Sequence, residues 1–156
     1  MSPHPEQPER LVLTASLTTG IARVAHGIPD ATALIDEILT LDHTDWESTL
    51  LVGDVEFHQT ARGPYPDHQM RVSVRPSAGY AALNYADNAD PAMSIANSYN
   101  PRRPLPGIYL IFNGGTGAVF PQAAAIPIEH ARDALREWLQ TRRRPTCIEW
   151  RPYDQY

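Results

Sequence analysis

Six histidines and one cysteine are the residues of this chain best suited to bind a metal or to act as a nucleophile. They are His4, His26, His43, His58, His68, His130 and Cys147. Zinc sites usually contain close pairs such as H-x3-H or C-x2-C, and the sequence has no such pair. We therefore expect no metal site and no cofactor.

Nucleophilic catalysis has equally little support in the sequence. There is no G-x-S-x-G motif of the kind that exposes a catalytic serine. Cys147 could act as a nucleophile, but it lies within an apolar stretch, and burial keeps a thiol protonated and inert. We expect it to pack in the core. We assign no catalytic residue and predict that the chain is not an enzyme.

The glycine-rich run at 114–117 has two interpretations. A phosphate-binding loop needs a lysine after its last glycine, and the chain contains no lysine at all. Asn113-Gly114-Gly115 is instead typical of a hairpin turn, because such turns need residues that tolerate positive φ.

Length and charge restrict the class of protein. The chain has 156 residues, enough for one domain, and its net charge of −5 disfavours a general binder of nucleic acid or membrane surfaces. No apolar run reaches the 18 or so residues of a transmembrane helix. One cysteine cannot form an internal disulfide and fits a reducing compartment, so we expect a cytoplasmic protein.

The negative charge is concentrated in one segment. Residues 30–67 carry nine carboxylates and one arginine, a net charge of −8, whereas the rest of the chain is net positive. This segment is either an ordinary solvated surface or an interaction face for a basic partner. In the second case the partner-binding candidates are Asp42, Asp45, Trp46, Glu47, Asp54, Glu56, Tyr65 and Asp67.

Trp46 also has two interpretations. Tryptophan is enriched at binding hot spots, but Trp46 could equally anchor the core. Arg142 to Arg144 suggest a nucleic-acid contact, yet basic residues at the end of a helix are explained by the helix dipole. We expect no direct nucleic-acid binding.

The hydrophobic pattern predicts two main helices. The first spans residues 31–41, with Asp30 as its N-cap, and the second begins with Pro127 as its first helical residue and is ended by Pro145. Strands are predicted at 11–17, 49–52 with an extension to Val55 and Phe57, 70–75, 80–85, 93–99, 108–112 and 146–150.

The order of these elements predicts the fold class. Consecutive strands between two helices indicate an α+β domain with an antiparallel sheet of about five to seven strands and two helices packed on it. We expect a disordered arm over residues 1–10, one domain over 11–151 and a short tail over 152–156.

The last third of the sequence resembles immunity protein family one of bacterial polymorphic toxin systems. The resemblance is carried by Phe120-Pro121, Ile126-Pro127, Trp138-Leu139 and the closing Arg144-Pro145-Thr146 to Trp150 pattern. It is specific over about residues 105–150, and from 30 to 104 it is only an order of elements.

This resemblance implies a protein that binds the catalytic domain of a toxin made by the same cell, a toxin that is often a nucleic-acid deaminase. It implies no cofactor, a cognate toxin domain as partner, no contact with membranes, and a monomer or weak homodimer. We expect Trp138, Cys147 and Trp150 to pack the last strand onto the second helix. An acidic surface could then occupy the basic cleft of the toxin in place of nucleic acid. The alternative functions are a small enzyme or ligand-binding module with a pocket in the strand-rich middle, and a regulator of another basic protein.

Overall fold

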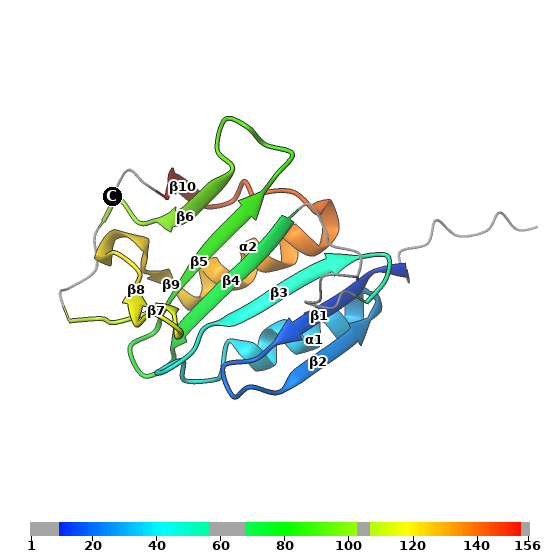
Figure 1. Ribbon diagram of the computed structural model, residues 1–156, viewed down its shortest axis with the longest axis horizontal. Coiled ribbons are helices and arrows are strands. Elements are labelled where there is room, and N and C mark those ends of the chain that lie inside the picture. Colours follow the sequence, from blue (N-terminus) through cyan, green and yellow to red (C-terminus); the bar gives the residue numbers. More distant parts are fainter. Residues whose placement is uncertain (1–9, 57–67, 103–106, 154–156) are drawn as a thin grey trace, which may run out of the picture.

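One large antiparallel sheet organises the chain (Figure 1). The computed structural model describes residues 10–56, 68–102 and 107–153. Its elements are β1 (Val12–Ser16), β2 (Ala22–His26), α1 (Gly27–Ile38), β3 (Ser48–Gly53), β4 (His68–Arg75), β5 (Tyr80–Asp87), β6 (Ile95–Tyr99), β7 (Ile111–Asn113), β8 (Ala118–Val119), η2 (Gln122–Ala124), β9 (Ile126–Pro127), α2 (Ile128–Thr141) and β10 (Glu149–Pro152).

The sheet confirms the predicted α+β class. Its strands follow the order β10-β6-β5-β4-β3-β1-β2, and the two-residue β9 pairs with β5, which makes eight strands within the described residues. This is one more than the upper end of the predicted range, because β2 and β9 were not predicted, whereas the strand predicted at 108–112 lies outside this sheet. A separate hairpin is formed by β7 and β8.

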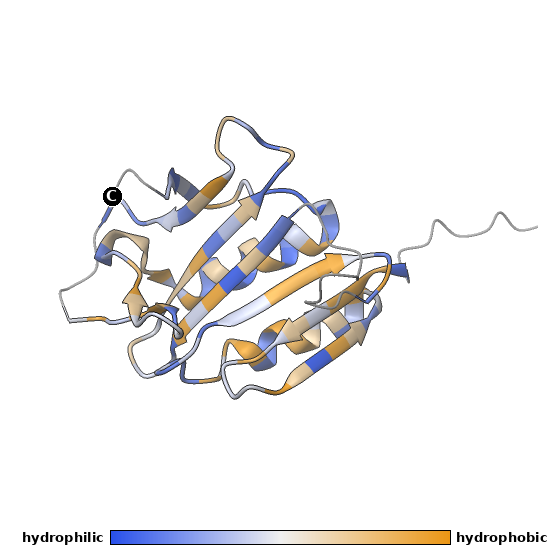
Figure 2. Ribbon diagram, in the orientation of Figure 1, coloured by the Kyte–Doolittle hydropathy of each residue, from blue (hydrophilic) through white to orange (hydrophobic). Residues whose placement is uncertain are grey.

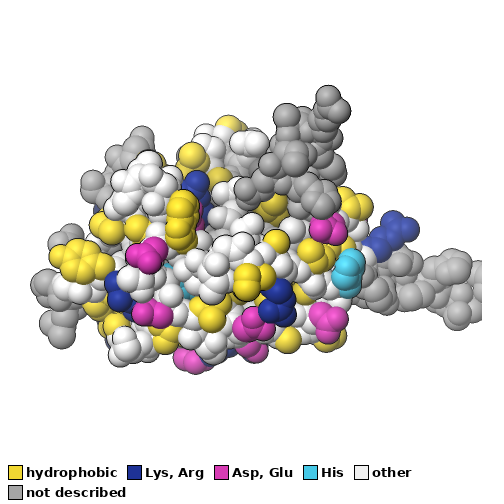
Figure 3. Space-filling view, turned by 60° about the horizontal axis from the view of Figure 1, so that its bottom comes forward, with side chains coloured by type: hydrophobic (Ala, Val, Ile, Leu, Met, Phe, Trp, Pro, Cys, Tyr) yellow, Lys and Arg dark blue, Asp and Glu magenta, His cyan; other side chains and the backbone are white. Residues whose placement is uncertain are grey.

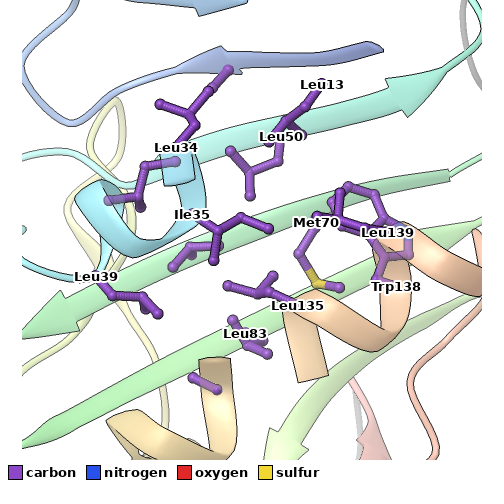
Figure 4. Packing of buried hydrophobic residues seen from close by; sticks show 14 of the residues in the cluster. Leu13, Leu34, Ile35, Leu39, Leu50, Met70, Leu83, Leu135, Trp138 and Leu139 are labelled. Atoms are coloured by element: carbon purple, nitrogen blue, oxygen red, sulfur yellow. The ribbon is translucent and has the colours of Figure 1, made fainter. Parts of the chain in front are cut away.

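Both helices lie on the same face of the sheet, behind it in Figure 1. Alternate residues of each strand point to this face, and in β4 they are Met70, Val72 and Val74, all fully buried. Figure 2 shows the corresponding alternation of hydrophilic and hydrophobic residues along β4. Figure 4 shows how Ile35 of α1 and Leu135 of α2 meet over the strands.

The opposite face is partly covered by residues 107–126. A second buried cluster joins Ala82 of β5 to Leu110, Phe120, Ala124 and Ala125. Ala82 lies between Ala81 and Leu83, which belong to the core beneath the helices, so its side chain points to the opposite face of the sheet.

Both helices begin and end at different residues from those predicted. The first helix begins at Gly27 and ends at Ile38, and Asp30 lies in its first turn instead of capping it. Asp30 can still interact favourably with the positive end of the helix dipole. In α2, Pro127 precedes the helix, and Arg142 ends it by adopting a left-handed conformation with φ of 54°, three residues before Pro145.

Several strand predictions were also shifted. The closing strand is Glu149–Pro152, so it begins three residues later than predicted and includes the first residue of the predicted tail. The third strand ends at Gly53, so Val55 does not extend it, and Phe57 lies outside the described residues. The predicted turn at 113–115 does connect β7 to β8, but the positive φ is at Gly117.

No helix within the described residues has the length and apolar character needed to cross a membrane.

Candidate functional site

The predicted acidic surface is divided between the two ends of β3. Residues 42–47 precede this strand and are called the Trp46 end; residues 54–56 follow it and are called the Asp54 end. A six-residue strand holds its two ends roughly 20 Å apart. Tyr65 and Asp67 lie outside the described residues.

Most carboxylates of this segment are paired with arginines from other parts of the chain. The pairs are Asp36 with Arg132 and Arg136 at 3.1 and 3.3 Å, Glu37 with Arg23 at 2.7 Å, Asp42 with Arg75 at 3.9 Å, Glu47 with Arg71 at 3.9 Å, and Asp54 with Arg142 at 2.8 Å. Figure 3 shows the molecule with the bottom of Figure 1 turned forward. On the face in view, carboxylates are scattered, arginines lie beside some of them, and there is no continuous acidic patch. Asp45 is exposed and forms no ion pair within the described residues.

A buried histidine anchors the Trp46 end to the sheet through hydrogen bonds. His43 is fully buried, and its ring nitrogens lie 2.9 Å from the Leu41 carbonyl oxygen and 2.7 Å from the Ser48 hydroxyl. Its backbone N–H donates to the Val74 carbonyl at 2.9 Å. Ser48 also accepts a hydrogen bond from the Thr18 N–H at 3.0 Å, so this network joins the loop to the β1–β2 hairpin.

The surroundings of His43 favour its neutral form. Burial lowers the pKa of the ring, and this effect exceeds the opposing influence of the Leu41 carbonyl and of the Asp42 and Glu47 charges. Because the Leu41 carbonyl can only accept, Nδ1 carries the proton and Nε2 accepts from the Ser48 hydroxyl.

Trp46 lies against Gly114, a residue 68 positions further along the chain. A Cβ atom added at Gly114 would lie 2.4 Å from two carbons of the indole ring and 2.5 Å from the Asp45 carbonyl oxygen, so only glycine fits. The Gly114 N–H donates to Glu47 Oε1 at 3.0 Å. Trp46 is nevertheless 51% exposed, so the structure rules out its interpretation as a core anchor.

A hollow of about 430 Å³ lies beside the indole. The β1–β2 hairpin supplies most of its wall, and the Trp46 end and the start of β3 supply the rest. Its lining residues are Ser16, Leu17, Thr18, Thr19, Gly20, Trp46, Glu47 and Thr49. The hollow therefore combines an aromatic face, a carboxylate and several hydroxyl groups, and none of the described basic residues lines it.

The Asp54 end is built differently. Asp54 accepts a hydrogen bond from the Arg142 guanidinium, and more than a third of each side chain is exposed. Val55 is 50% exposed and Glu56 is also exposed. Asp54, Val55 and Glu56 are thus all exposed at this end.

The two C-terminal tryptophans both pack against Tyr85 of β5. Trp138 is fully buried and donates from Nε1 to His68 Nδ1 at 3.1 Å. Trp150 is half-buried and donates to the Pro145 carbonyl at 2.8 Å. Both rings contact Tyr85, with centroids 6.5 and 6.2 Å away.

The prediction of a buried Cys147 was wrong. Cys147 is exposed, because β10 begins only at Glu149 and the preceding residues run along the surface. Its backbone N–H donates to Glu137 Oε1 at 3.1 Å. Partial burial and the nearby Glu137 carboxylate raise the pKa of the thiol to about 11, so it stays protonated at neutral pH and is a poor nucleophile.

Cys147 borders a second hollow of about 740 Å³ at the start of α2. Its other ionisable or aromatic lining residues are Tyr80, Tyr99, Arg102, His130 and Glu149. Across residues 10–56, 68–102 and 107–153, no three histidine, cysteine or acidic side chains are grouped so that they could hold a metal. The hollow has the size of a ligand pocket but no activated nucleophile.

Sequence reasoning missed three residues that build the Trp46 end: His43, Ser48 and Gly114. His43 was considered only as a metal ligand, and no second ligand near it in sequence indicated its buried role. Gly114 was interpreted through its local turn, whereas its essential contact is with a segment 68 residues away.

A comparison with models of protein families finds a match over most of the chain. The model of the family described as Immunity protein Imm1 matches residues 20–152, which is most of the chain. No curated protein and no solved structure matches at a significant level. The match begins at Gly20, in the turn before β2, and extends to the end of β10, so it includes both ends of β3 and both helices. The chain therefore belongs to the Imm1 family of immunity proteins, whose members act against a toxin.

Proposed function

We propose that this immunity protein neutralises a cognate secreted toxin that modifies nucleic acid, of the deaminase type, by binding its catalytic domain and blocking the substrate cleft without any catalysis of its own. The observation that carries the proposal is the Trp46 end, where a half-exposed indole and the exposed Asp45 carboxylate, which forms no ion pair with a described residue, are presented on a loop fixed by buried contacts.

The charge of the partner follows from its substrate. An enzyme that acts on nucleic acid needs basic groups that neutralise phosphates. Carboxylates of an inhibitor can occupy the positions of those phosphates. Complementary charge then speeds association and sets orientation more than it adds affinity. Asp42, Asp45 and Glu47 of the Trp46 end are the carboxylates proposed for this role.

The Asp54 end is proposed to contribute less. Asp54 forms a close ion pair with Arg142 at 2.8 Å, whereas Asp42 and Glu47 lie 3.9 Å from their arginines. A single interface of ordinary size could still extend to both ends, because it measures about 800 Å² on each partner. The two groups of carboxylates therefore have to be tested separately.

The site of action is proposed to be the cytoplasm, since a toxin that modifies nucleic acid damages the producing cell there. The proposed form in solution is a monomer or weak homodimer, so that one chain binds one toxin domain.

The proposal is tested by co-expressing this chain with the C-terminal domain of the large secreted protein encoded beside it. Growth should be restored, and the purified chain should inhibit deamination of a nucleic-acid substrate by that domain. Growth rescue without deaminase activity in the domain would retain the immunity function and overturn the deaminase assignment. A toxic domain that is neither bound nor inhibited would overturn the proposal.

A further inference from the structure

We propose that the hollow beside Trp46 is a binding site for the guanidinium group of an arginine side chain of the toxin domain. This inference rests on the proposed function and deepens it by naming the chemical group that the Trp46 end recognises.

The lining of the hollow matches the chemistry of a guanidinium group. Its planar cation stacks on an aromatic face and forms hydrogen bonds through five N–H donors, so its site needs an aromatic ring and several acceptors. The hollow offers the indole of Trp46, the Glu47 carboxylate and the hydroxyls of Ser16, Thr18, Thr19 and Thr49. Its volume of about 430 Å³ leaves room for a whole side chain.

None of the arginines in the described ranges 10–56, 68–102 and 107–153 lines the hollow. Arg71 pairs with Glu47 at 3.9 Å but does not line the hollow. It is held elsewhere, 4.9 Å from the centre of the Phe112 ring and 3.4 Å from the Phe112 carbonyl oxygen. Glu47 Oε1 accepts one hydrogen bond, from Gly114. A carboxylate has about four acceptor positions, so Glu47 can accept further hydrogen bonds.

The aromatic wall of this site is fixed before binding. Gly114 sets the position of the indole, and the bond from its N–H orients Glu47. The opposite wall is fixed because Ser48, buried beneath the loop, accepts from the Thr18 N–H. A binding group that is already in its bound position loses little conformational entropy on association. Asp45, exposed next to Trp46, adds a second negative charge without an ion pair among the described residues.

The first experiment compares two apolar truncations at the two ends of β3. Trp46→Ala removes the aromatic wall, and Val55→Ala is the control because Val55 is exposed to the same degree, 50% against 51%. We expect Trp46→Ala to weaken binding of the toxin domain at least tenfold and Val55→Ala to change it less than twofold. Circular dichroism should show that both variants are folded at the temperature of the binding measurement, although Trp46→Ala loses the packing of the indole on Gly114.

The second experiment identifies the arginine. Each arginine of the toxin domain is replaced by alanine in turn, and its binding to the wild type and to Trp46→Ala is measured. One Arg→Ala change should weaken binding of the wild type about as much as Trp46→Ala does, and should cause little further loss with Trp46→Ala. Replacing that arginine by lysine should restore little of the affinity, because an ammonium group lacks the planar fork.

The outcomes separate this inference from the proposed function. If Trp46→Ala binds the toxin domain as tightly as the wild type does, or if no toxin arginine is coupled to Trp46, the arginine site is overturned. The immunity function would still stand. Absence of wild-type binding would overturn both.

Discussion

The two ends of β3 carry similar side chains in different surroundings. Each has exposed carboxylates next to an apolar side chain that is about half exposed, Trp46 at one end and Val55 at the other. The Trp46 end is held by the fully buried His43 and by Gly114, a residue distant in sequence. Asp54 is held by an exposed ion pair to Arg142. If the Trp46 end binds the toxin as proposed, the firm positioning of its exposed groups distinguishes it from the Asp54 end, and not the number of its charges.

The largest effect should come from filling the space at Gly114. Gly114→Ala places a methyl group 2.4 Å from the indole and 2.5 Å from a backbone oxygen, so the loop must shift. We expect a loss of about 1–3 kcal/mol in the free energy of unfolding and a loss of toxin affinity of tenfold or more. Denaturant unfolding and calorimetric binding measure the two effects.

Gly115→Ala is the matched control for this substitution. A Cβ there would meet mainly the side chain of Asn113 at 3.2 Å, and it would be 4.0 Å from the indole. Near wild-type stability and affinity are expected. Equal effects of the two substitutions would show that Gly114 acts only through its turn and not through Trp46.

The next largest effect, on the rate of association with the toxin domain, should come from the carboxylates at the two ends of β3. One variant combines Asp42→Asn with Asp45→Asn, and the other combines Asp54→Asn with Glu56→Gln, so each loses two negative charges. The first should slow association with the toxin domain several-fold at low salt and reduce its salt dependence. The second variant should leave the association rate and its salt dependence nearly unchanged. Stopped-flow experiments at low and high salt measure the association rates. A larger effect of the second variant than of the first would assign the interface to the Asp54 end.

A smaller effect should follow the protonation of His43. The folded state lowers the pKa of this ring below its ordinary value of 6.5, so the unfolded state binds the proton more readily. The stability that His43 contributes is therefore fully present above about pH 6.5 and decreases as the pH falls below it. His43→Gln should be less stable than the wild type at pH 7. Its free energy of unfolding should then change less between pH 7 and pH 5. If the free energies of unfolding of the wild type and the variant depended on pH in the same way, this would contradict the interpretation that His43 is buried in its neutral form.

The smallest effect is expected at the Asp54–Arg142 pair. Both side chains are partly exposed, and ion pairs of this kind contribute about 0.2–1 kcal/mol. Asp54→Asn should therefore change the free energy of unfolding by no more than this, and high salt should reduce the difference further. A loss well above that range would mean that the Asp54 end is as firmly built as the Trp46 end.

The sequence predicted the class of fold because its local patterns were strong. Alternation in β4 and the amphipathic face of α2 correctly indicated a strand and a helix of an antiparallel α+β domain. The second strand was missed because four of its five residues are exposed, which leaves no alternating pattern. Cys147 was misplaced because apolar neighbours suggested burial where the chain runs along the surface.

The candidate site was predictable only in part. Local charge pointed to residues 42–47 as part of the surface, whereas the sequence left Trp46 open between a binding contact and a core anchor. The contact between Trp46 and Gly114 depends on how distant segments pack, and no local pattern reveals it. The same is true of the arginines of β2, β4 and α2 that pair with the acidic segment and make its net charge a poor guide to its surface.

Amide hydrogen exchange of the chain, alone and bound to its toxin domain, tests the central claim most directly. If the Trp46 end is the inhibitory surface, binding should slow exchange at residues 42–47, at the β1–β2 hairpin around Thr18 to Gly20 and at Gly114, and should leave residues 54–56 unchanged. Slower exchange confined to residues 54–56, or to the hollow beside Cys147, with no change at residues 42–47, would contradict the account.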